Sequence, residues 1–197
     1  MSESVEKIIH TLYVKFMMWD LFARIVPGGL VLMVLFRTVD VGVPFSLTGE
    51  GSGVLGWLAM AGAAWMTGLV VGSVAAEFGV VRMHPPRHSE TAARIHLRRY
   101  FMGQSSAEDR VLAERYAIVK EATGNAAAAL LLSAILLLLG ALGRGEIGTF
   151  LNAYWLGIFV LVLFSYAFRQ VNMRSAEKEF ELIRQVAGEG GKSEEAA

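Results

Sequence analysis

The sequence predicts an all-α fold, a four-helix transmembrane bundle whose helices extend into the cytoplasm around a small helical insert. Of its 197 residues, 54% are hydrophobic and only 18% charged, and the mean hydropathy of +0.48 is too apolar for a soluble domain of this size. The apolar residues gather in four runs of near-spanning length. Lysine and arginine gather on one side of those runs, so both termini and the insert are expected in the cytoplasm, with the spans in the cell inner (plasma) membrane.

Three of the runs contain no charged residue: residues 54–75, 125–142 and 150–168. A helix needs about 20 apolar residues to cross a hydrocarbon layer of about 30 Å. The alternative is three buried helices in a large soluble core. A chain of this length could not cover three such helices with polar surface, so we expect membrane spans.

The first run, from Phe16 to Phe36, is less regular. Asp20 and Arg24 lie four residues apart, which places them on one helix face as an interfacial ion pair. Pro27, Gly28 and Gly29 then interrupt the pattern and predict a hinge. We expect an amphipathic interfacial helix up to Val26, a kink, and a span to Phe36. The expected units are residues 1–26 (interfacial helix), 27–75 (spans 1 and 2), 76–124 (insert), 125–168 (spans 3 and 4) and 169–197 (tail).

Orientation follows from the basic residues beside the spans. Two precede Phe16, eight lie in residues 76–124 and five follow Phe168. The two remaining connections hold one each, Arg37 and Arg144. This asymmetry predicts that the insert and both termini are cytoplasmic.

The insert is expected to contain a short basic helix, Ser89 to Phe101, after the helix-blocking pair Pro85-Pro86. Ser105 and Ser106, followed three residues later by Glu108 and Asp109, form a capping-box pattern that predicts the start of a second helix. That helix should continue into the third span, and the fourth span should continue into the tail as a helical stalk. The polar end, from Gly188, is expected to be disordered. Paired amphipathic stalks favour homo-oligomers.

Several residues are candidate sites. The basic run could bind an anionic ligand such as a nucleotide, or lipid head groups, although topology alone also explains it: Arg94, Arg98 and Arg99. Small residues at four-residue spacing predict a helix-packing face: Ala64, Gly68, Gly72 and Ala76. Polar residues in the spans could line a pore or bond between helices: Asn125, Ser133 and Asn152. Three histidines lack a carboxylate at fixed spacing and are read as solvated rather than metal ligands: His84, His88 and His96.

No catalytic motif is present, and the chain has no cysteine. We therefore expect no enzymatic activity, no cofactor and no metal. The zero net charge gives no argument for sequence readout of DNA.

The stretch from Asp20 to Gly28, DLFARIVPG, resembles the "DxFAxxxPG" opening of small bacterial four-span inner-membrane proteins, some of which are membrane effectors in anti-phage defence loci. The resemblance implies a protein that opens or disrupts the inner membrane when a cytoplasmic signal changes. It implies no binding residues.

Three functional hypotheses remain. The first is an oligomeric channel or membrane-perturbing effector gated from the cytoplasm by a protein or nucleotide signal. The second is a non-conducting anchor or scaffold that recruits a cytoplasmic protein. The third, a small transporter or membrane enzyme, is disfavoured by the lack of paired charges within the spans. All three have the lipid bilayer as a partner.

Overall fold

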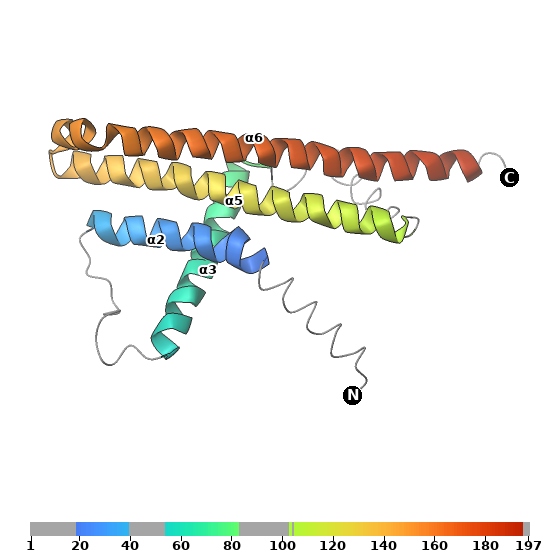
Figure 1. The fold of residues 1–197 in the computed structure, drawn as a ribbon, viewed down its shortest axis with the longest axis horizontal. Coiled ribbons are helices and arrows are strands. Elements are labelled where there is room, and N and C mark those ends of the chain that lie inside the picture. The colour runs from blue at the N-terminus through green and yellow to red at the C-terminus, as the bar shows by residue number, and fades with distance from the viewer. Residues whose placement is uncertain (1–18, 40–53, 83–102, 104, 195–197) are drawn as a thin grey trace.

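The computed structural model describes residues 19–39, 54–82, 103 and 105–194 (Figure 1). This part of the chain is all-α and contains no strand, as the sequence predicted. Its elements are the π-helix η1 (Leu21–Ile25) and the α-helices α2 (Val26–Val39), α3 (Val54–Glu77), α5 (Ala107–Gly143) and α6 (Ile147–Glu194). Within the described residues, four stretches are long and apolar enough to cross a membrane, which makes this a multi-pass membrane protein: Leu21–Val39, Gly56–Glu77, Ala107–Gly143 and Ile147–Ile183.

The two longest helices, α5 and α6, lie side by side as an antiparallel hairpin, and α2 lies along α5 (Figure 1). Helix α3 crosses them obliquely (Figure 1). The hairpin turns at Gly145, whose φ of +70° suits a residue without a side chain. There the amide of Glu146 donates to the carbonyl of Ala141, which closes the end of α5.

The predicted capping box is confirmed at the start of α5. The Ser106 hydroxyl accepts a hydrogen bond from the Asp109 amide, and the Asp109 carboxylate accepts one from the Ser106 amide, both at 3.1 Å. From this cap α5 runs without a break for 37 residues, and α6 runs for 48. Both spans therefore continue into helical extensions. Helix α6 reaches Glu194, beyond Gly188, where we expected disorder; extending an existing helix requires no new nucleus.

The helices pack through small residues. The core cluster combines three alanines of α5 with residues of α2, of α3 and of the turn that follows α3: Val31, Val71, Ala75, Val81, Ala127, Ala128 and Ala129. Without a hydrophobic driving force in lipid, close backbone approach through such residues is a main source of helix association. In α6, by contrast, no residue from Ile147 to Phe164 is buried, so much of the apolar surface of this span is left for lipid or a neighbouring chain.

The sequence predicted a break at Pro27, Gly28 and Gly29, but the helix continues through these residues. Instead the chain is helical from Trp19 to Val39, and one π turn precedes the proline. In that turn the amide of Val26 donates to the carbonyl of Leu21, five residues back. The wider turn accommodates the proline ring within a continuous helix. The apolar stretch therefore begins at Leu21 rather than at Pro27, and residues 1–18 of the expected interfacial helix lie outside the described residues.

Gly28 and Gly68 lie where η1 and α2 cross α3. A Cβ on Gly28 would collide with the backbone carbonyl of Ala64, and a Cβ on Gly68 would collide with that of Arg24. Each carbonyl therefore rests against the other helix's glycine. The partner of the small-residue face is thus the first span of the same chain.

Replacing either crossing glycine by alanine should separate the helices. We expect Gly28→Ala and Gly68→Ala each to destabilise the protein by about 1–3 kcal/mol, because backbone atoms have to move. Two matched controls have room for a Cβ: Gly29→Ala meets only an ordinary contact at 3.8 Å and Gly62→Ala meets nothing within 4 Å. These controls should be neutral or slightly stabilising, since alanine favours helix. Thermal unfolding in detergent micelles checks this; equal effects of all four substitutions would contradict the crossing.

Candidate functional site

Charged and amide side chains meet at one end of the spans, where the long extensions of α5 and α6 begin. We call this cluster the polar junction: Asp20, Arg24, Lys120, Glu121, Asn125, Asn172 and Glu179. It joins η1, α5 and α6, and it also holds the segment that follows α3.

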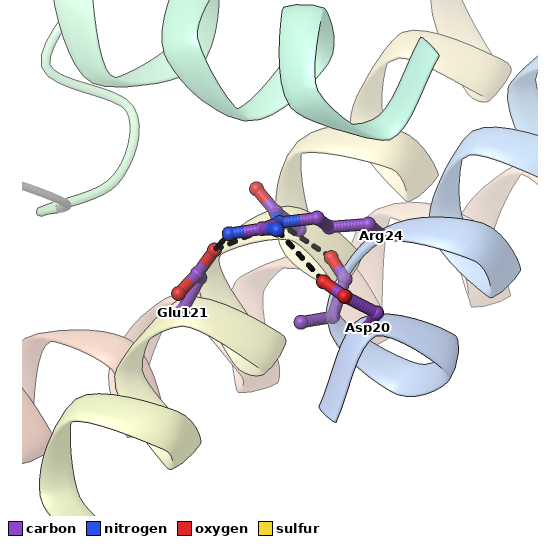
Figure 2. A network of polar contacts seen from close by, with 5 residues as sticks. Asp20, Arg24 and Glu121 are labelled. Atoms are coloured by element: carbon purple, nitrogen blue, oxygen red, sulfur yellow. Dashed lines mark hydrogen bonds and ion pairs between the residues drawn. The ribbon is translucent and has the colours of Figure 1, made fainter. Parts of the chain in front are cut away.

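Arg24 lies between two carboxylates (Figure 2). Its Nη1 contacts Asp20 Oδ1 at 2.7 Å, and its Nη2 and Nε contact Glu121 Oε1 at 2.8 and 3.2 Å. The guanidinium also lies 5.8 Å from the ring centroid of Trp65 on α3. The side chains of Arg24 and Glu121 are each 23% exposed, so little water competes for these bonds. Arg24 therefore connects η1, α3 and α5 with charge-assisted contacts.

Asn125 forms a hydrogen bond to the backbone next to Pro27. In an α-helix the carbonyl of residue 23 accepts from the amide of residue 27, and Pro27 has no amide hydrogen. The Ala23 carbonyl accepts instead from Asn125 Nδ2 on α5, at 2.5 Å. Ala23 is fully buried and Asn125 is 3% exposed. Since an unpaired carbonyl in this setting is expensive, Asn125 compensates for the proline.

This assignment predicts non-additive substitutions. Asn125→Leu should destabilise the protein by about 1–3 kcal/mol, because it removes the side-chain donor to the buried Ala23 carbonyl. Pro27→Ala restores an amide that can donate to that carbonyl within the helix. The loss caused by Asn125→Leu should therefore be at least halved in the Pro27→Ala background. A double-mutant cycle of unfolding free energies in micelles measures this coupling. Strictly additive effects would show that Asn125 acts independently of the proline.

The other side of the polar junction joins α5 to α6. The ammonium of Lys120 pairs with the carboxylate of Glu179, and both side chains are less than one-fifth exposed. Asn172 of α6 is fully buried. Its Oδ1 accepts from the Arg82 amide at 2.8 Å, and its Nδ2 donates to the carbonyls of Lys120 at 2.8 Å and Arg82 at 3.2 Å.

The structure places the residues singled out in the sequence as follows. Asp20 and Arg24 form the expected pair, and Gly29 is half-buried beside the crossing. Ala64, Gly68 and Gly72 are buried, and Ala76 is partly buried against the core. The six basic residues singled out in the insert lie outside the described residues: Arg94, Arg98, Arg99, His84, His88 and His96. Within the described residues, no group of three or more His, Cys, Asp or Glu side chains could hold a metal.

The polar residues considered for a pore are mostly turned inward. Asn125 and Ser133 are buried between helices, and Ser165, not singled out before, donates to the Ala127 carbonyl at 2.8 Å. Asn152 alone of the three candidates is exposed. Asn125 and Ser165 thus bond to backbone carbonyls within one chain, whereas the hydroxyl of the buried Ser133 has no hydrogen-bond partner among the described residues.

Sequence reasoning missed Glu121, Lys120, Glu179 and Asn172. The one available signal was position, because Lys120 and Glu121 directly precede the third apolar run. The partner of Lys120 lies 59 residues away and the partner of Glu121 lies 97 residues away, so sequence spacing cannot reveal either pair.

No protein-family model, curated protein or solved structure matches this chain.

Proposed function

We propose that this protein is an oligomeric inner-membrane effector in which a cytoplasmic signal, received by the helical extensions, changes the arrangement of the spans and so the permeability of the membrane. The observation that carries the proposal is the polar junction. Within six residues of α5, Lys120 contacts α6, Glu121 contacts Arg24 of η1, and Asn125 contacts the Ala23 carbonyl.

The continuity of α5 supports this coupling. The same helix carries the extension from Ala107 and the apolar span that ends at Gly143. A shift of the extension therefore moves residues that hold η1 and α6. A membrane anchor requires no such connection between its extension and its first span.

The buried polar residues support assembly. Because Asn125, Ser133 and Ser165 are buried within one chain, a conducting path would have to form between copies or at the lipid boundary. The uncovered apolar face of α6 leaves room for such contacts.

The location and the signal belong to the same proposal. The termini and insert are cytoplasmic, since the polar junction and the charged helix extensions lie together at one end of the spans and most basic residues flank that end. A cytoplasmic protein or a nucleotide would act on the insert, with Arg94, Arg98 and Arg99 as candidate contacts for an anionic ligand. A role in anti-phage defence rests on the resemblance of the Asp20–Gly28 stretch alone.

A second candidate is a non-conducting scaffold that recruits a cytoplasmic partner. The inward-facing polar residues and alanine-rich packing of the described spans favour it, because they leave a single chain sealed.

Dye release from vesicles of phosphatidylethanolamine and phosphatidylglycerol distinguishes the two. Arg24→Gln and Glu121→Gln each remove a charged hydrogen bond worth about 1.5–3 kcal/mol, which corresponds to about a tenfold or larger shift between two states. If the junction holds the closed arrangement, both substitutions should accelerate release by about that factor. Glu146→Gln is the control, since Glu146 is 65% exposed and pairs with Arg144 at the other end of the spans.

Absence of release from every variant, at protein densities where cross-linking shows oligomers, would overturn the effector proposal in favour of the scaffold. Equal release from wild type and all variants would refute the role of the junction.

Orientation is testable because the chain has no cysteine. Single-cysteine variants Gly103→Cys and Gly148→Cys occupy exposed positions with nothing within 4 Å of the new Cβ. A membrane-impermeant maleimide should label Gly148→Cys in intact spheroplasts, and Gly103→Cys only after permeabilisation. The reverse pattern would invert the proposed topology.

A further inference from the structure

Two sets of close contacts position α3, one within the helix and one just after its C-terminal end. One is the crossing with η1 and α2 at Gly68, where the carbonyl of Arg24 sits against the glycine. The other lies just beyond its C-terminal end, at residues 80–82. Between and around these places the contacts of α3 are with η1, α2 and α5.

The second attachment is made to backbone atoms of residues 80–82. Gly79, at φ +68°, ends α3: the Val80 amide donates to the Ala75 carbonyl, and the Gly79 amide donates to that of Ala76. This turn presents the next residues to α6. There Arg169 Nε donates to the Val80 carbonyl at 2.8 Å, and the Asn172 amide pairs with both the amide and the carbonyl of Arg82. We call this attachment the clasp.

Asn172 makes the clasp a three-way contact. Its Nδ2 also donates to the Lys120 carbonyl on α5, so the end of α3 is joined to both helices of the hairpin. Asn172 is fully buried, and its amide nitrogen and oxygen are both bonded. The residues that follow α3 therefore move with the α5–α6 pair.

The part of α3 that precedes Ala64 is not held in this way. Every buried residue described in α3 lies at Ala64 or later, whereas Trp57 and Leu58 are 61% and 62% exposed. In Figure 1 this end of α3 lies well away from α5 and α6. Among the described residues, the attachments that position this end lie further along the helix.

We propose that α3 is a lever, with its pivot at the Gly68 crossing and its driven end at the clasp. Along the helix axis, the arm from Gly68 to Trp57 measures about 16–17 Å, and the arm from Gly68 to Glu77, where the helix ends just before the clasp, measures about 13–14 Å. A displacement of the α5–α6 extensions of about 1–2 Å, typical of helix shifts, therefore swings the Trp57 end by a similar distance. This inference rests on the proposed function, for which it supplies the moving part, and Arg169 and Asn172 are its positioning residues.

Distances between spin labels test the lever on full-length protein in lipid nanodiscs, because cysteine pairs can be placed freely in this chain. The reporting pair is Leu58→Cys on α3 with Leu151→Cys on α6. The reference pair, Leu139→Cys with Leu151→Cys, lies within the α5–α6 hairpin. All three side chains are exposed.

Asn172→Ala should change the mean distance of the reporting pair by about 2 Å or more, or clearly broaden its distribution, and leave the reference pair unchanged. Arg169→Met, which removes only the bond to Val80, should act in the same direction and serves if Asn172→Ala does not fold. The matched control is Asn152→Ala, an exposed asparagine of the same helix.

An unchanged reporting pair in both clasp variants would overturn the lever. So would equal changes in the two pairs, since the clasp would then only stabilise the hairpin. The measurement is independent of dye release: a moving reporting pair with no release from any variant would keep the lever and reject the effector function.

Discussion

Inside a bilayer no water can accept or donate to the backbone, so every carbonyl must find a partner in the protein. Pro27 has no amide hydrogen for the Ala23 carbonyl, and the contacts of the first span around that carbonyl compensate for this loss. Asn125 of α5 supplies the missing donor, and the π turn from Leu21 to Ile25 leads the helix into the proline without a break. A single proline thereby fixes which face of the first span meets the third.

Charged side chains add further contacts between the same helices. Arg24 is one residue beyond Ala23, so the turn held by Asn125 also aims its guanidinium at Glu121, one turn earlier on α5. On the same helix the preceding residue, Lys120, pairs with Glu179 of α6. Because these side chains are mostly shielded from water, their contacts are stronger and more directional than surface ion pairs. Helix α5 consequently connects its own extension to both η1 and α6, and the proposed function depends on that connection.

Sequence patterns predicted correctly the interactions between residues that are close together in the chain. The capping box at Ser106 and the Asp20–Arg24 pair both involve residues within one helical turn, and both are present. The helix continues through Pro27-Gly28-Gly29, where the local pattern predicted a break, because packing overrides local propensity. Gly28 allows a close backbone contact with Ala64. The proline is tolerated because Asn125, about 100 positions away, donates to the buried Ala23 carbonyl. For Asn125 and Ser133 the sequence left pore lining and interhelical bonding open; Asn125 bonds to the Ala23 carbonyl, and Ser133 is buried.

The sequence by itself determined the all-α fold, four apolar stretches long enough to cross a membrane and the unbroken helical extensions. These depend on hydrophobic run length, helix capping and the absence of breakers, which are properties of neighbouring residues. The tertiary structure alone decided which helices cross at Gly28 and Gly68, that Glu121 completes the Arg24 site, and that Asn172 holds Arg82. Each of these joins groups far apart in the chain, and only the packed arrangement of the helices brings their atoms within bonding distance.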